Sequence, residues 1–263
     1  MLKTLSEFFE RPLKSGFVIE NRYQITGFLG KGSYGMTYYA VDKKTSERIV
    51  VKQLRKRKYK TSKQDFIKEA ETLSTLSHPS IPKCLDFVQW EDKMFLMMEL
   101  IEGKNFEELI LGEGQIYDEK ESLHFLLEVL KIVKYLHNHQ LIHRDLRLPN
   151  ILLKKDQLFI IDLGLSEFLN EKKNPTSKEK PGSLEKQLFR DLSVESDFYA
   201  LGHFILFLLY SKFTPSSKKE SSWEEELTLT NDTKQIIRKL LKLEACYENV
   251  DEIILNVENA LKR

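Results

Sequence analysis

The sequence predicts an α+β fold in two parts, a small strand-rich part with one main helix and a larger, mostly helical part. Two observations support this prediction. Up to about residue 101, short apolar runs alternate with turn residues, which is typical of an antiparallel sheet. After Gly103, apolar residues recur at the spacing of amphipathic helices. We therefore expect an N-terminal extension over residues 1–21, a small lobe over 22–101 and a larger lobe over 102–263, the two lobes forming one domain.

Four segments of the small lobe have the composition of strands, at residues 23–29, 36–42, 49–54 and 94–100. A glycine-rich turn joins the first two, as in a hairpin. One helix is expected at about 63–76, because Phe66 and Ala70 lie on an apolar stripe, and His78-Pro79 ends it. The basic run at 55–60 could bind nucleic acid, but in a near-neutral chain such a run is more typical of a solvated loop.

The larger lobe begins with a helix after Asp118, a residue that can form a capping box with Glu121. After it we expect short strands at 151–154 and 158–161, a polar loop at 170–180, a buried apolar helix from Asp197 to about Tyr210, and amphipathic helices near 234–243 and 250–261.

The composition of the chain excludes some classes of partner but does not indicate a function. The 263-residue chain has a formal net charge of +1, so no overall attraction to nucleic acid or anionic membranes is expected. Its two cysteines, Cys84 and Cys246, lack metal-ligand spacing and fit a reducing compartment. The longest apolar run, 198–210, is too short for a bilayer core of about 30 Å. We therefore expect a cytoplasmic protein without membrane insertion or a nucleic-acid partner, and no pattern indicates its oligomeric state.

Residues 30–35 form a Gly-x-Gly-x-x-Gly motif, with Lys31, Ser33 and Tyr34 between the glycines. Such glycines let backbone N–H groups approach phosphate oxygens. A dinucleotide-binding turn has the same spelling, but there the glycines lead from a strand into a helix. Here they lead into a second strand and then to Lys52, which favours a loop that covers nucleotide phosphates.

Lys52 lies inside an apolar strand, where a cation is costly unless it is paired. Glu69 lies seventeen residues later on the expected helix, and an ion pair between the two would present the ammonium group to phosphates. The plainer alternative is an edge-strand lysine and a solvated glutamate. Glu71 is an alternative partner for Lys52, but the number of residues between the glutamate and His78-Pro79 favours Glu69.

Residues 143–150 read His-Arg-Asp-Leu-Arg-Leu-Pro-Asn and are followed by an Asp-Leu-Gly turn at Asp162. Asp145 is the candidate base for an acceptor hydroxyl, and Asn150 and Asp162 are candidate Mg²⁺ ligands because hard oxygens suit a hard cation. Arg147 places a cation where it could stabilise a transferred phosphoryl group. His143 is expected to be a packed core histidine.

In these residues the chain resembles the bacterial eukaryotic-like (Hanks-type) serine/threonine protein kinases, in a small form without a sensor or membrane domain. The resemblance runs from about Tyr23 to Leu261 and also includes hinge residues 99–101 and the segment 196–202. It implies a two-lobed protein-kinase-like fold with ATP in the cleft, and Mg²⁺ as the metal with Mn²⁺ as an alternative. It also implies transfer of the γ-phosphoryl group to serine or threonine hydroxyls of protein substrates, including the chain's own.

The resemblance assigns roles by position. Catalytic roles are implied for Lys52, Glu69, Asp145 and Arg147, and metal binding for Asn150 and Asp162. Nucleotide contacts are implied for Gly30, Lys31, Gly32, Ser33, Gly35, Thr37, Val50, Lys52, Met98 at the gatekeeper position, Glu99, Ile101 and Leu152. Asp197 matches a buried aspartate that starts the central helix and braces the catalytic loop.

The chain also departs from the family's pattern. Arg147 stands where lysine is usual, and Leu163 replaces a phenylalanine. Residues 183–185, Ser-Leu-Glu, fall where Ala-Pro-Glu is expected, and the arginine partner of that motif is absent. Arg144 is a candidate to dock a phosphorylated residue of the segment 166–183. These departures keep open a pseudokinase that works as a binding module, a small-molecule kinase, and tyrosine specificity.

Overall fold

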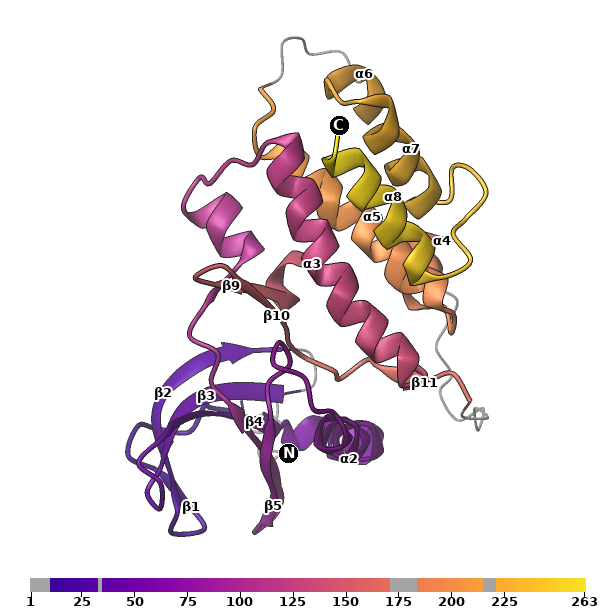
Figure 1. Cartoon of the computed structure of the whole chain (residues 1–263). Helices are drawn as coiled ribbons and strands as arrows, with labels where there is room; N and C mark the ends of the chain where they lie inside the picture. Colours follow the sequence, from indigo (N-terminus) through magenta and orange to yellow (C-terminus); the bar gives the residue numbers. More distant parts are fainter. Residues whose placement is uncertain (1–9, 33–34, 171–183, 215–220) are drawn as a thin grey trace, which may run out of the picture. The chain divides into compact units, whose positions relative to one another are not determined.

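The computed structural model describes residues 10–32, 35–170, 184–214 and 221–263 (Figure 1). The chain divides into two compact units, Met1–Glu102 and Gly103–Arg263. Each unit has its own arrangement of strands and helices. Among the described residues, no helix combines the length and the apolar character needed to cross a membrane.

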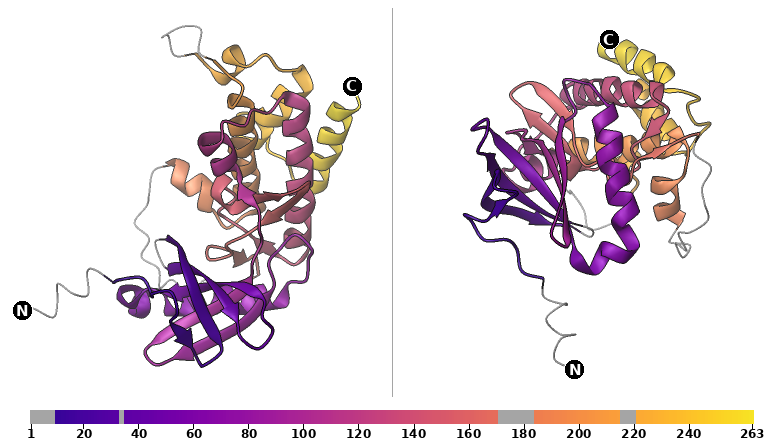
Figure 2. Two further views of the ribbon diagram at one scale, coloured as in Figure 1. Left: turned by 90° about the vertical axis from the view of Figure 1, so that its left-hand side faces the viewer. Right: turned by 90° about the horizontal axis from the view of Figure 1, so that it is seen from below.

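The first unit is built on a six-stranded antiparallel sheet with the strand order β1-β2-β3-β4-β6-β5. Its strands are β1 (Val18–Ile19), β2 (Tyr23–Lys31), β3 (Gly35–Asp42), β4 (Arg48–Leu54), β5 (Cys84–Trp90) and β6 (Lys93–Glu99). A short 3₁₀ turn, η1 (Lys56–Lys58), leads into the helix α2 (Tyr59–Thr75), which lies against the sheet (Figure 2). The four predicted strands are present, and β1 and β5 are additional.

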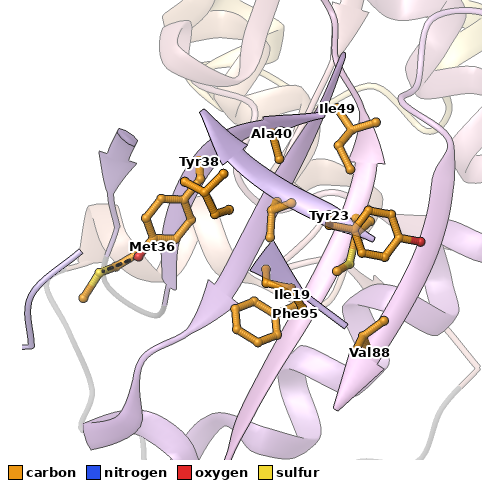
Figure 3. Packing of buried hydrophobic residues seen from close by; sticks show 11 residues of the cluster. Ile19, Tyr23, Met36, Tyr38, Ala40, Ile49, Val88 and Phe95 are labelled. Carbon is orange, nitrogen blue, oxygen red and sulfur yellow. Dashed lines mark hydrogen bonds between the residues drawn. The ribbon is translucent and has the colours of Figure 1, made fainter. Parts of the chain in front are cut away.

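Side chains alternate across this sheet, so that each face has its own core. On one face, Phe66 and Ala70 of α2 pack against Leu54, Met94 and Leu96. The opposite face carries a larger cluster of eleven buried residues: Ile19, Tyr23, Ile25, Met36, Tyr38, Ala40, Ile49, Val51, Val88, Phe95 and Met97. Figure 3 shows these side chains together, including the hydrogen bond of 3.2 Å from the Tyr38 hydroxyl to the Met36 sulfur.

The described residues before β2 pack against this sheet. In the described part of the extension expected over 1–21, β1 pairs with β2, and Ile19 is fully buried in the larger cluster. Leu13 and Phe17 pack against the same cluster. The expectation of a solvated basic loop at 55–60 was wrong, because Arg55 is 4% exposed and the following residues form η1 and the start of α2.

The second unit is mainly helical, and its long helices are α3 (Glu119–Asn138), α5 (Val194–Tyr210), α7 (Asn231–Leu240) and α8 (Val250–Leu261). In Figure 1, α3 and α5 run side by side, and α8 packs on α3 and α7. The predicted capping box at the start of α3 is present, with Asp118 and Glu121 each accepting from the other's backbone N–H. The shorter helices are η2 (Glu108–Gly112), η3 (Leu148–Asn150), α4 (Leu184–Arg190) and α6 (Trp223–Glu226).

Short strands beside α3 carry the residues of greatest functional interest. β9 (Ile151–Lys154) and β10 (Gln157–Ile160) form the predicted hairpin, and β7 (Lys104–Asn105) pairs with β9. β8 (Leu141–Ile142) pairs with β11 (Glu167–Phe168) and leads into the loop at residues 143–150.

Candidate active site

In the first unit, five of the residues predicted to contact a nucleotide lie on one face of the sheet: Gly30, Thr37, Val50, Lys52 and Met98. Residues directly opposite each other in antiparallel strands share a face. Thr37 is opposite both Gly30 and Lys52, and Val50 is opposite Met98. Val50 and Lys52 are two residues apart on β4, so their side chains point to the same side of the sheet. The residues paired with them across the sheet, Met98 and Thr37, point to that side as well. Thr37, Val50, Lys52 and Met98 are all half-buried, so this face is partly open to solvent.

Lys52 and Glu69 form the predicted ion pair, with 2.6 Å between Nζ and Oε1. The two side chains are 13% and 5% exposed. At this burial an unpaired ammonium or carboxylate would be costly, so each charge stabilises the ionised form of the other. The ammonium group is therefore held at a defined position beneath the glycine-rich turn that joins β2 to β3.

The glycine-rich turn depends on its third glycine. A Cβ added to Gly35 would lie 3.1 Å from the Gln53 carbonyl oxygen and 3.3 Å from Lys52 Cγ. A side chain here would therefore press on the stem of Lys52. Gly32 donates its N–H to the Gly35 carbonyl at 2.9 Å, which closes the turn. Ser33 lies outside the described residues, and Lys31 is exposed.

The remaining predicted nucleotide contacts come from two places in the chain. Glu99 ends β6, and its N–H donates to the Lys83 carbonyl at 3.0 Å. Ile101 is buried at 8% exposure. Leu152 belongs to the second unit, where it is buried in β9 opposite Asn105.

In the second unit, Asp145 is held by donors from both sides. Arg147 forms a two-pronged ion pair with it, from Nε to Oδ1 at 2.7 Å and from Nη2 to Oδ2 at 2.9 Å. Asn150 donates its Nδ2 to the same Oδ2 and to the Asp145 carbonyl, both at 2.8 Å. The hydrogen bond to Asp145 raises the pKa of Arg147, and the nearby charge of Asp162 adds to the effect. The orientation of this carboxylate is thus fixed in the protein itself.

Asn150 and Asp162 are brought close by the β9–β10 hairpin. Ile151 is paired with Ile160, and the N–H of Ile161 donates to the Asn150 carbonyl at 2.9 Å. The Asp162 backbone lies in the left-handed region, with φ of 64°, which is uncommon outside glycine and marks a sharply turned position. Because Asn150 turns its NH₂ toward Asp145, its amide oxygen points the other way. An amide oxygen and a carboxylate are the ligands a hard divalent cation prefers, so this donor set fits Mg²⁺.

The loop that carries Asp145 is braced by Asp197, which is fully buried in α5. Its Oδ2 accepts from the His143 N–H at 2.9 Å and its Oδ1 from the Arg144 N–H at 2.8 Å. Its Oδ2 also lies 2.9 Å from His137 Nε2, a partner that the motifs did not reveal. Burial by itself would raise the pKa of Asp197, but the His137 hydrogen bond and the other donors outweigh it and lower the pKa. His143 is fully buried, as expected.

Arg144 also has a left-handed backbone, with φ of 63°. Its guanidinium donates to the Arg190 carbonyl at 3.0 Å and to the Leu165 carbonyl at 3.3 Å, and lies 3.8 Å from Glu167. Arg144 therefore ties the catalytic loop to chain segments on either side of residues 171–183. Residues 171–183, which are most of the segment 166–183 considered above for phosphorylation, lie outside the described residues, as do the side chains of Leu184 and Glu185.

Known proteins similar to this chain indicate its family. The model of the family described as "Protein kinase domain" matches residues 23–259. A "Probable serine/threonine-protein kinase YbdM" of Bacillus subtilis is 34% identical over 99% of this chain and 98% of its own length. A "Serine/threonine-protein kinase B" of Synechocystis is 30% identical over 86% of this chain, and the match spans 44% of that longer protein.

A solved structure extends the comparison to the fold. The kinase domain of PknI from Mycobacterium tuberculosis, in a mutant form, superposes with a TM-score of 0.73 at 17% identity, covering 95% of this chain and 99% of that one. This likeness supports the fold, and the sequence relatives support the family. The chain therefore belongs to the protein kinase family, which confirms the resemblance to bacterial serine/threonine protein kinases.

Proposed function

We propose that this protein kinase transfers the γ-phosphoryl group of ATP to serine and threonine hydroxyls of protein substrates, including its own, with Mg²⁺ as the metal and Mn²⁺ as an alternative. The observation that carries the proposal is the arrangement around Asp145. A carboxylate offers about four acceptor sites. Arg147 uses two of them and Asn150 one, so the oriented carboxylate retains acceptor capacity for a substrate hydroxyl.

Each residue then has a role in transfer. Asp145 orients the acceptor hydroxyl and takes its proton as the hydroxyl oxygen bonds to the γ-phosphorus and the bond to the leaving ADP breaks. Lys52, held by Glu69, neutralises charge on the nucleotide phosphates, and the turn at 30–35 covers them. Arg147 keeps Asp145 in place and adds positive charge beside it. Asn150 and Asp162 would hold the cation, which when bound supplies charge neutralisation for the phosphates.

In the first unit, the adenine end of the nucleotide would meet the sheet face of Thr37, Val50 and Met98, together with Glu99 and Ile101. For Leu152 of the second unit, a nucleotide contact is implied by the family's pattern alone. These assignments rest on the shared face of the three sheet residues and on the family's pattern for the others. Val50 is larger than the alanine usual at its position, which favours a narrow purine slot.

The proposal is tested by transfer from γ-labelled ATP with Mg²⁺, using purified protein and a general protein substrate. We expect labelled serine or threonine, identified by mass spectrometry, and a loss on the order of 10²–10⁴-fold in Asp145→Asn. Asp156→Asn is the matched control, because Asp156 is an exposed aspartate in the turn of the β9–β10 hairpin and should retain full activity.

Other outcomes identify the alternatives. ATP binding without transfer to any acceptor would identify a binding module. Label found on a small molecule from a metabolite extract, with no labelled protein, would identify a small-molecule kinase. Label on tyrosine would overturn the proposed acceptor specificity, which the arginine at position 147 makes worth checking.

A further inference from the structure

Residues 10–19 form a segment, here named the N-terminal strap, that is fastened to the sheet of the first unit along its length. The Leu13 N–H donates to the Tyr38 hydroxyl at 3.3 Å, and Gly16 and Phe17 exchange backbone hydrogen bonds of 2.8 Å with Ile25. Phe17 packs edge-to-face on Trp90 at 5.6 Å. The strap thereby covers the larger core cluster, which α2 does not reach.

The first described residue of the strap, Glu10, reaches a buried arginine. Its carboxylate accepts from the Lys56 N–H at 3.0 and 3.1 Å, which fixes it at the end of β4. There it lies 4.0 Å from Nε of Arg55, whose side chain is 4% exposed. A guanidinium buried to this extent needs opposite charge nearby, and the Glu10 carboxylate places negative charge at ion-pair distance from it, beyond the range of a hydrogen bond.

Arg55 in turn contacts the glycine-rich turn. Its Nη1 donates to the Gly32 carbonyl at 3.4 Å, at the long end of the hydrogen-bond range. The backbone N–H of Gly32 donates to Gly35 and closes the turn, while the backbone carbonyl of Gly32 accepts from Arg55. Both backbone polar groups of Gly32 are therefore hydrogen-bonded. Glycines lose more conformational freedom on ordering than other residues, so an external anchor lowers the cost of holding the turn in one shape.

We propose that Arg55 is a positioning residue for the glycine-rich turn and that Glu10 of the N-terminal strap sets Arg55 in place, so that the strap tunes affinity for nucleotide phosphates. The proposal rests on the ATP-binding function proposed above. It assigns to the strap a role in ligand binding in addition to its role in covering the core.

The test compares ATP with adenosine, which lacks the phosphates, as ligands of the full chain and its variants. Arg55→Met retains side-chain length and removes the charge, and we expect its Kd for ATP to rise roughly tenfold, as for loss of one charge-assisted hydrogen bond, with Kd for adenosine unchanged. Glu10→Gln should act in the same direction by a smaller factor. The double variant should resemble Arg55→Met alone, because the two residues act in series.

Arg22→Met is the matched control, since Arg22 forms an ion pair with Asp42 in the same sheet, at 2.7 Å, without contacting the turn. It should leave both Kd values unchanged even if it lowers the melting temperature. Equal rises for ATP and adenosine in Arg55→Met would show a merely structural role, and an unchanged ATP affinity would overturn the proposal.

Amide hydrogen exchange of peptides spanning 28–37 gives a readout that needs no nucleotide. Exchange should be faster in Arg55→Met than in wild type and in Arg22→Met. If wild-type protein binds no ATP, the proposed function fails, while faster exchange in Arg55→Met alone would still establish the anchor. Unchanged exchange would refute the anchor whatever the ATP result.

Discussion

Arg147 and Asp145 meet as two planar groups, and their geometry has a consequence for substitution. The two hydrogen bonds of 2.7 and 2.9 Å need the fork of a guanidinium, which an ammonium cannot reproduce. Arg147→Ala should lower kcat roughly tenfold through loss of one positioning interaction, with a smaller change in KM for ATP. Arg147→Lys should fall between alanine and wild type.

Steady-state kinetics with a fixed peptide substrate would check this ordering. A lysine variant as impaired as the alanine variant would show that the fork matters and the charge does not. An alanine variant with wild-type kcat would remove Arg147 from the catalytic residues.

Asp197 gives a prediction about pH. Its pKa is lowered in the folded chain from an ordinary value of 3.8, so the ionised carboxylate stabilises the fold fully above about pH 4. That contribution is lost as pH falls through the folded pKa. In Asp197→Asn the amide can accept at one oxygen only, so one of the two backbone N–H groups is left without an acceptor, at a cost of about 1–3 kcal/mol.

The contribution of the Asp197 charge to stability can be measured by urea unfolding of wild type and Asp197→Asn between pH 7 and pH 3. We expect wild type to be the more stable at neutral pH and the difference to narrow below about pH 4. A difference that stays constant over the whole range would contradict the assigned role of the Asp197 charge.

At the level of elements, the N-terminal strap, which includes β1, contributes buried and partly buried residues to the larger core cluster although it is short. Ile19 is 0% exposed, and truncating such a residue removes buried apolar contacts and leaves a cavity. Ile19→Ala should lower the free energy of unfolding by roughly 2–5 kcal/mol. Leu85→Ala, at a residue that is 45% exposed on β5, should cost less than about 1 kcal/mol.

Chemical denaturation followed by tryptophan fluorescence would compare the two variants, since Trp90 packs on Phe17 of the strap. Equal losses at both positions would mean that the larger cluster is not the main core of the first unit.

Elements with a local signal were predicted well, and those without one were missed or displaced. The start of α3 was predicted at Asp118 because both members of its capping box are visible in the sequence. Neither α2 nor α5 has a side-chain cap hydrogen bond at its start, and both begin three or four residues before the expected position. The β5–β6 hairpin turns at Glu91, with φ of 54°, where glycine or asparagine would have signalled a turn.

At the scale of the whole molecule, ligand binding should appear as stability. ATP at about 100 times its Kd would stabilise the folded chain by ~2.7 kcal/mol, which corresponds to roughly 5–10 °C in Tm for a chain of this size. Removing Mg²⁺ with a chelator should reduce this shift. Asp162→Asn should make the shift insensitive to Mg²⁺, because the carboxylate that would hold the cation is gone.

Differential scanning fluorimetry with and without Mg²⁺ checks both statements, and Asp156→Asn again serves as the control. If addition of Mg²⁺ increases the shift in Asp162→Asn as much as in wild type, the metal lies elsewhere.

Asp145, Asn150, Asp162 and the glycines at 30–35 were proposed as site residues because each lies in a short motif, and a motif can be recognised from neighbouring residues in the sequence. What could not be predicted is which distant residues hold them. The contacts of His137 with Asp197 and of Glu10 with Lys56 join residues 60 and 46 positions apart, and no local pattern encodes such pairs. The basic run at 55–60 was misjudged for the same reason, because the burial of Arg55 depends on the strap and the turn.

The hydrogen bonds that buried Asp197 accepts also bear on the order in which the chain folds during synthesis. The backbone of the catalytic loop is tied to a residue 53 and 54 positions later, on α5. A nascent chain that has released residues 143–150 but not residue 197 therefore lacks the acceptor for two of its loop N–H groups. We therefore expect the loop at residues 143–150 to take its ordered form only after α5 has left the ribosome.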